Sequence, residues 1–318
     1  MNAVESALHQ SLNREEFEII VIKNFVDSSI DKFLEVHKIR NIITSLNTTG
    51  EWFEIALNNS KGDVITFLDD DDLYVQNKLE IVKEMFSKYS NLIYLHNNSK
   101  KFYSTNQDIN TYERGILQNI INIDINTRSG FIQALRKNYF QNLSAISIRR
   151  EVLEKGIEYI KQTNHGTDMV IFISSLNIGG LRFHIDACLS LYMIHQESHT
   201  NSPKGDLLEF QNKRKITIPY YINDFYLLFN MVENNHAKHY LEIRTFTSKI
   251  WLDLISEKRT RFFFVQEIFK ILPYIRYYRQ SVFFILIYPL YTIFPTATKH
   301  LYFIFLDTNL GWRLRSPA

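Results

Sequence analysis

The chain has 318 residues, of which 45% are hydrophobic and 22% are charged, so it can bury one large core or two ordinary ones. A net charge of +2 gives no general attraction for nucleic acid, and we expect no nucleic-acid partner. The single cysteine, Cys188, excludes an internal disulfide and a zinc site built from several thiolates, which favours the reducing cytoplasm.

The N-terminal part of the chain alternates helical and extended patterns. It lacks the basic start and apolar run of a signal peptide, and amphipathic spacing predicts a helix over 4–12 instead. A continuous β-branched run predicts a buried strand over 17–23. Helix and strand then alternate over 30–36, 39–46, 52–59, 63–68, 74–89 and 92–96. This order is typical of an α/β fold with a mixed, mostly parallel sheet flanked by helices, whose ligands bind beyond the carboxyl ends of the strands.

The remainder of the chain divides into two parts by its patterns. The first part contains a strand or short helix near 116–125, then helix, strand, helix, helix and extended chain over 131–138, 143–148, 149–160, 167–176 and 181–194. The second part is dominated by long helical patterns over 207–235, 237–258 and 262–279. We therefore predict one domain over 1–205 and a helical C-terminal region over 206–318.

Four consecutive carboxylates, Asp69 to Asp72, follow the predicted strand over 63–68. Two like charges about 4 Å apart repel by on the order of 4 kcal/mol at an effective dielectric near 20, so the group needs solvent or a cation. A solvated loop is one interpretation, and Asp72 alone could be the N-cap of the next helix. At the end of a buried strand, the group favours a divalent metal and a diphosphate, and its oxygen ligands suit Mg²⁺ or Mn²⁺.

Several segments, in the right order, resemble family 2 glycosyltransferases, which are inverting enzymes of the GT-A fold. AVESALHQSL, EIIVIKN and SKGDVITFLDDDD are similar to the first helix, a nucleotide-side strand and the Leu-Asp-x-Asp-Asp motif of that family. The acceptor-side strand and helix of the family resemble LSAISIRREVLEKG in this chain. The segment with the catalytic acid resembles HGTDMVIFISSL, and the closing segment resembles YMIHQESHTNS. The resemblance covers about residues 3–202.

The resemblance implies a Rossmann-like GT-A catalytic domain over 1–205 that transfers a sugar from a nucleotide-diphosphate donor to a hydroxyl acceptor with inversion, as a hexosyltransferase. It implies that Asp168 is the general base, although a carboxylate at a helix start could also serve as a cap. It assigns donor binding to Asn24, Asp27, Asp69 and Asp70, and binding of Mg²⁺ or Mn²⁺ to Asp71 and His195.

Three departures from the family pattern motivate an alternative function. The family's first strand, ending in Pro-x-Tyr-Asn, should precede the first helix, whereas this chain starts inside that helix; a misplaced start codon or a truncation would explain this. The basic residue of the Ala-Arg-Asn segment is absent from 54–58, and Met193 replaces the usual Arg. The alternative is a non-catalytic relative that binds nucleotide or partners without transfer. A metal-dependent phosphohydrolase is disfavoured, because only His195 and Asp168 are candidates for further ligands.

Basic and aromatic residues alternate over 258–279, and an apolar stretch over 281–306 contains Pro289 and Pro295. This composition suits an anionic membrane interface, while the prolines argue against an ordinary transmembrane helix. Buried helices packed over the catalytic domain are the other interpretation. We expect peripheral membrane contact through 258–306 at the cytoplasmic face, which suits a lipid-linked or other glycan acceptor.

Overall fold

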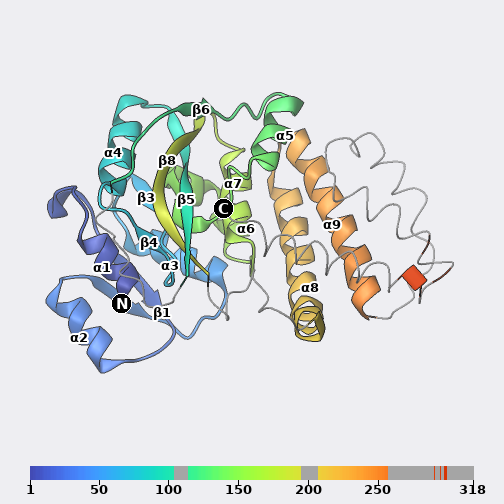
Figure 1. Cartoon of the computed structure of the whole chain (residues 1–318), viewed down its shortest axis with the longest axis horizontal. Helices are drawn as coiled ribbons and strands as arrows, with labels where there is room; N and C mark the ends of the chain where they lie inside the picture. Colours follow the sequence, from blue (N-terminus) through green and yellow to red (C-terminus); the bar gives the residue numbers. More distant parts are fainter. Residues whose placement is uncertain (104–113, 195–206, 257–289, 291–293, 295–296, 299–318) are drawn as a thin grey trace. The chain divides into compact units, whose positions relative to one another are not determined.

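The computed structural model of the chain describes residues 1–103, 114–194, 207–256, 290, 294 and 297–298 (Figure 1). The chain forms two compact units, one of Met1–Asn201 with Leu227–Lys238 and one of Ser202–Tyr226 with His239–Ala318. His195, the predicted helix over 262–279 and most of the membrane-contact stretch lie outside the described residues, as does the predicted domain boundary between 205 and 206.

The first half of the larger unit alternates helices and strands, as its sequence predicts. The elements are α1 (Asn2–Leu8), β1 (Ile20–Lys23), α2 (Ser28–Val36), β2 (Arg40–Ile43), α3 (Thr49–Asn59), β3 (Val64–Thr66), β4 (Leu73–Tyr74), α4 (Lys78–Lys88) and β5 (Leu92–Tyr103). Helix α3 starts with a reciprocal capping box between Thr48 and Glu51, which satisfies two backbone N–H groups.

Asp72 is not the N-cap of the following helix. Strand β4 intervenes, because Leu73 and Tyr74 pair with β8, and helix α4 starts only at Lys78, after Asn77 as its N-cap. The predicted helix start near residue 74 was therefore too early. Asp72 instead accepts a hydrogen bond from the Met193 N–H of the neighbouring strand (3.0 Å).

The second half of the larger unit contains β6 (Ile120–Asn122), α5 (Arg128–Arg136), β7 (Ile146–Arg149), α6 (Arg150–Ile160), α7 (Thr167–Ser175) and β8 (Leu181–Ile194). A short 3-10 turn, Leu143–Ala145, leads into β7 where the sequence predicted strand alone. Its cap residue, Asn142, has a φ of 69°, which is unusual for a residue with a side chain.

The described strands form two sheets. Strands β1 and β2 pair in parallel, and the larger sheet has the order β3-β7-β5-β8-β4 with β6 also paired to β8. The predicted mixed sheet flanked by helices is confirmed. The predicted parallel bias is not: β5–β8 is parallel, but the other four described pairs of the larger sheet are antiparallel. The reason is that β7 runs opposite to β3 and β5, and that β4 and β6 run opposite to β8, which the helix–strand alternation of the first 97 residues does not reveal.

Helices cover both faces of the larger sheet. Successive residues of a strand point to opposite faces, so one strand contacts helices on both sides. Leu95 of β5 belongs to a buried cluster with Val82 and Phe86 of α4. The neighbouring residue Tyr94 points the other way, and its ring meets Phe172 of α7 edge-on with centroids 5.5 Å apart. Figure 1 shows α4 and α7 on opposite sides of the β5–β8 pair.

The predicted helical C-terminal region is confirmed by α8 (Leu207–Met231) and α9 (Asn235–Ser256). Within the second unit, cations of these helices lie over aromatic rings: Arg214 over Trp251 and Arg244 over Phe225. Such contacts contribute about 0.5–1 kcal/mol each at exposed sites. Among the described residues, no helix combines the length and the apolar character needed to cross a membrane.

Candidate functional site

Three of the four consecutive aspartates bring carboxylate oxygens together. Asp69, Asp71 and Asp72, the aspartate triad, each offer one oxygen, and these oxygens all lie within 4.8 Å of one another. They share a tight loop between β3 and β4, closed by a hydrogen bond from the Asp72 N–H to the Asp69 carbonyl (3.2 Å). The fourth residue, Asp70, is exposed and lies outside the triad.

Asp72 is the buried member of the triad, with no exposed surface. Its Oδ1 accepts a hydrogen bond from the Met193 N–H (3.0 Å). Its Oδ2 is buried without a hydrogen-bond partner among the described residues. The pKa of Asp72 is raised to about 6, chiefly by burial, and the Met193 N–H and the nearby Ser144 hydroxyl oppose this rise. An unpaired buried carboxylate oxygen is costly unless a cation or proton meets it.

Asp69 is held between like charges. Its pKa is raised to about 7, chiefly by burial and also by the charges of Asp72, Asp71 and Asp168. The donor set consists of oxygens only, its charges repel, and one buried oxygen lacks a partner among the residues that the structure describes. These features fit a hard divalent cation such as Mg²⁺ or Mn²⁺.

Asp168 lies in the first turn of α7, close enough to the triad for its charge to raise the pKa of Asp69. The N-cap of α7 is Gly166, so Asp168 is not the N-cap. Its carboxylate accepts hydrogen bonds from the N–H groups of Met169 (2.7 Å) and Asn142 (3.2 Å). The residue is only partly buried overall, but its carboxyl group lies deep enough that burial raises its pKa.

Lys78 is a buried cation beside the triad that the sequence analysis missed. It is fully buried, its Nζ donates to the Ser144 carbonyl and to Ser190 Oγ (3.0 Å), and it lies 4.1 Å from the centre of the Tyr74 ring. Burial lowers its pKa to about 7, and the nearby Asp72 charge opposes this. The sequence signal that could have identified it is a lysine on the apolar face of the predicted helix over 74–89.

The predicted nucleotide-side residues Asn24 and Asp27 follow β1. Asn24 is exposed, and its amide donates to Asn47 (3.4 Å). Asp27 is the N-cap of α2 and accepts from the N–H groups of Ser29 and Ile30, and its hydrogen bond with the Ser29 hydroxyl is the main cause of a lowered pKa. Asn24 is thus joined to the loop before α3 and Asp27 to the first turn of α2, and a donor-binding role for both stays a prediction.

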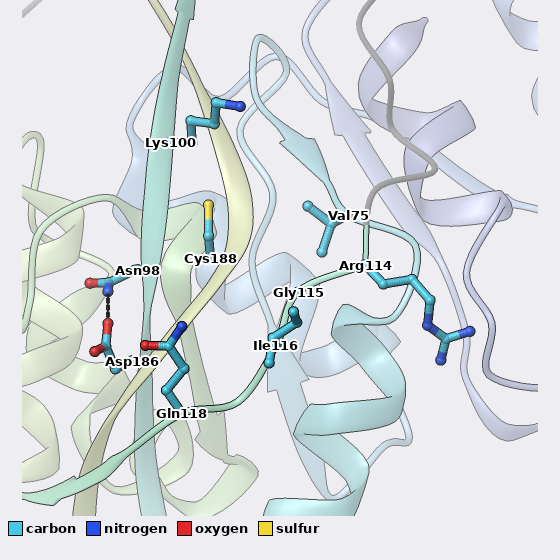
Figure 2. Close-up of a pocket in the computed structure, with 9 residues that line it drawn as sticks. All are labelled: Val75, Asn98, Lys100, Arg114, Gly115, Ile116, Gln118, Asp186 and Cys188. Carbon is cyan, nitrogen blue, oxygen red and sulfur yellow. Dashed lines mark hydrogen bonds between the residues drawn. The ribbon is translucent and has the colours of Figure 1, made fainter.

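A separate pocket of about 300 Å³ lies beside β5 and β8 (Figure 2). One side is formed by Asn98, which donates to Asp186 (2.6 Å), and the other by Arg114 and the segment after it. Its lining residues are Val75, Asn98, Lys100, Arg114, Gly115, Ile116, Gln118, Asp186 and Cys188. None of the predicted site residues lines it, so the chemistry points to the aspartate triad instead of this pocket.

Comparison with known families decides what kind of domain carries the triad. Residues 2–156 match the model of glycosyl transferase family 2. This part of the chain is a family 2 glycosyltransferase domain. The match includes the aspartate triad and ends before Asp168 and His195, which the predicted resemblance over residues 3–202 had included. No curated protein matches the chain.

Solved structures similar to this chain are distant in sequence. S. aureus TarS 1-349 in complex with UDP is 12% identical with a TM-score of 0.45, over 77% of this chain and 64% of that one. S. aureus TarS is 12% identical with a TM-score of 0.47, over 78% and 40%. The mannosyltransferase PcManGT from Pyrobaculum calidifontis, in complex with GDP-Man and Mn²⁺, is 12% identical with a TM-score of 0.46, over 89% and 78%. The chain thus spans less than two thirds of the two TarS chains.

Proposed function

We propose that the chain transfers a sugar from a nucleotide-diphosphate donor to a hydroxyl acceptor, with inversion at the sugar. The observation that supports this most directly is the aspartate triad, in which Asp72 has a buried oxygen without a partner among the described residues. The carboxyl group of Asp168 lies close enough to affect the pKa of Asp69, and the triad lies in the part of the chain that matches glycosyl transferase family 2. A cation site and a base are the two components that such a transfer requires.

Within this proposal, Asp71 and Asp72 hold Mg²⁺ or Mn²⁺, and Asp69 lies between that cation and the donor. His195 keeps its predicted role as a further ligand, although it lies outside the described residues. When bound, the cation offsets the negative charge that develops on the departing diphosphate. Asn24, Asp27 and Asp70 remain our candidates for contacts with the nucleotide part of the donor.

Asp168 acts as the general base in this proposal. It takes the proton of the acceptor hydroxyl as that oxygen forms a bond to the anomeric carbon, and the diphosphate leaves from the opposite face with the bonding electron pair. Attack from the face opposite the leaving group inverts the configuration. A carboxyl group whose pKa is raised by burial is a stronger base than an exposed one, which suits proton removal near neutral pH.

The acceptor we propose is a glycan or a lipid-linked sugar, reached at the cytoplasmic face of a membrane through the basic and aromatic stretch over 258–306. The support is the composition of that stretch, which alternates cations and aromatic rings.

The decisive experiment titrates the purified chain with Mn²⁺ and a panel of nucleotide sugars by calorimetry, and then assays nucleotide release with candidate acceptors. Binding of one nucleotide sugar in the presence of Mn²⁺, abolished by EDTA, is the expected result. Binding of nucleotide without transfer to any acceptor would favour the non-catalytic relative. The absence of both Mn²⁺ binding and nucleotide binding would overturn the proposed function.

A further inference from the structure

Ser144 lies inside the site, yet none of the roles above uses it. Its side chain is fully buried, and its Oγ accepts a hydrogen bond from the Asp69 N–H (3.0 Å). The same hydroxyl lies close enough to the Asp72 carboxylate to favour its charged form. Ser144 therefore reaches both ends of the loop that carries the aspartate triad.

The backbone of Ser144 is anchored as firmly as its side chain. Its carbonyl oxygen accepts hydrogen bonds from Lys78 Nζ and from Ser190 Oγ (2.6 Å), and both of these side chains are buried. Asn97 adds a further hydrogen bond to Ser190 Oγ (3.2 Å). The position of the Ser144 hydroxyl is thus set by α4, β5 and β8 together, independently of any bound ligand.

The same turn reaches Asp168. The Asn142 N–H donates to Asp168 Oδ2 (3.2 Å), and the Asn142 side-chain oxygen accepts from the Ser144 N–H (2.9 Å). Asn142 has a φ of 69°, and backbone strain of this kind persists only where the surrounding structure enforces it. Residues Asn142–Ser144, the bridging turn, therefore connect the carboxyl group of Asp168 to the aspartate triad through consecutive hydrogen bonds.

We propose that the bridging turn is a positioning element, and that Ser144 presets the loop of the aspartate triad to receive a divalent cation at a fixed separation from Asp168. The inference rests on the proposed function, because it assigns a role toward that cation and that base. The Ser144 hydroxyl fixes the Asp69 N–H, and the Met193 N–H fixes the Asp72 carboxylate, whose Oδ2 has no partner among the described residues. Residues that orient metal ligands typically contribute 10- to 100-fold to metal affinity or activity.

The test compares Ser144→Ala with Ser147→Ala in the full chain. Both serines are buried, but Ser147 Oγ has no hydrogen-bond partner among the described residues, so the second variant is a matched control for loss of a buried hydroxyl. We expect Mn²⁺ affinity, measured by calorimetry without nucleotide, to fall at least 10-fold in Ser144→Ala. We expect it to stay within 2-fold of the unmodified chain in Ser147→Ala.

Transfer assays give a second readout. We expect kcat of Ser144→Ala to fall about 10- to 100-fold with the acceptor KM unchanged, because Ser144 acts through Asp69 and Asp72. Ser144→Thr, which keeps the hydroxyl, should recover most of the Mn²⁺ affinity. If Ser144→Ala does not fold by circular dichroism, Ser144→Cys takes its place, because it preserves the size of the side chain and weakens its hydrogen bonds.

Three results would count against the inference. Unchanged Mn²⁺ affinity and kcat in a folded Ser144→Ala or Ser144→Cys protein overturns it while leaving the proposed function intact. Equal losses in Ser144→Ala and Ser147→Ala also overturn it, because packing and not hydrogen bonding would then be responsible. An unmodified chain that binds neither Mn²⁺ nor a nucleotide sugar overturns the proposed function, and this inference with it.

Discussion

Among the described residues, the hydrogen bonds to the Asp168 carboxylate come from the backbone N–H groups of Met169 and Asn142. Backbone donors hold the carboxylate in one orientation without sharing a titratable proton. Burial raises its pKa, which prepares it to accept a proton. The residue thus combines a fixed position with increased basicity, the two properties that a general base needs.

Asp168→Asn keeps the shape of this side chain and removes its basicity. We expect transfer to fall about 10²- to 10⁴-fold, the usual contribution of a general base, while donor affinity stays within about 2-fold. Calorimetry with the donor and a nucleotide-release assay measure the two quantities. Asp124→Asn is the control, because the Asp124 side chain closes a turn through hydrogen bonds with Asn126 and Thr127. Unchanged turnover in Asp168→Asn would refute the role as a base.

His96 and His184 form a buried pair, and their hydrogen bonds determine which ring nitrogens carry protons. Their Nδ1 atoms are 2.9 Å apart, and His96 Nε2 is 2.9 Å from the Gln141 carbonyl oxygen. That carbonyl needs a donor, so the proton of His96 resides on Nε2 and His184 donates from its Nδ1. Tyr139 stacks on His184 with centroids 4.1 Å apart, next to the bridging turn.

We expect both rings to remain neutral at pH 5. Burial lowers the pKa of His96 to about 3, assisted by the His184 and Lys78 charges, and that of His184 to about 4, opposed by Asp186. Below pH 6.5 the unfolded chain protonates each ring and the folded pair does not. The pair's contribution to stability therefore falls by up to about 1.4 kcal/mol per pH unit for each ring, down to about pH 4.

Ring protonation is the quantity to measure, because the raised pKa of Asp69 acts on stability in the opposite sense over part of the same range. Nitrogen-15 spectra of the imidazole rings should show one protonated nitrogen per ring, Nε2 in His96 and Nδ1 in His184, from pH 7 to 5. Uptake of a second proton by either ring between pH 7 and 5 would contradict the buried pair.

At the level of elements, helices α3 and α6 pack through a glycine. Gly50, in the first turn of α3, donates its N–H to the Thr163 carbonyl (3.2 Å) just beyond the end of α6. A Cβ atom at Gly50 would lie 2.1 Å from the Ile160 carbonyl oxygen and 2.7 Å from that of Thr163. Both obstacles are backbone atoms, so the side chain can be accommodated only if the two helix ends separate.

Gly50→Ala should therefore destabilise the larger unit by roughly 1–3 kcal/mol, the usual cost of overpacking. Urea unfolding followed by circular dichroism measures this cost as a lower midpoint. Gly179→Ala is the matched control, because a Cβ at that position meets no atom within 4 Å. Equal midpoints for the two variants would show that α3 and α6 can move apart without cost.

The helix–strand pattern predicts elements well where one apolar run forms one element. Strand β8 matches its predicted bounds, and α6 and α7 each differ from theirs by one residue. The pattern fails where pairing partners are distant: β4 exists only because Leu73 and Tyr74 meet Leu191 and Ser190. A two-residue strand has no periodicity of its own, so the sequence could not reveal it.

For the whole molecule, the match to family 2 ends at residue 156, but the compact unit that contains it extends to Asn201 and includes Leu227–Lys238. Helix α7, with Asp168, and strand β8, which pairs with β4 and β5, both lie after the matched residues. The proposed base therefore belongs to the same folded unit as the aspartate triad.

Membrane contact is the prediction that belongs to the whole chain. We expect the full chain to float with vesicles containing phosphatidylglycerol at low salt and to be released at about 0.5 M salt, because screening at that ionic strength shortens the range of charge attraction to a few ångströms. Phosphatidylcholine vesicles are the control for charge. A chain that stays unbound with both kinds of vesicle at low salt contradicts the predicted contact.

The sequence by itself determined the α/β class, most of the elements and the aspartate cluster, because these depend on residues that are neighbours in the chain. It also singled out Asp168, but only through resemblance to a family. Only the tertiary structure decided that Asp69, Asp71 and Asp72 converge while Asp70 does not, and that Ser144 and Lys78 support them. Lys78 meets Ser190 across 112 positions of sequence, and such contacts exist only once the sheet has formed, because no local pattern records them.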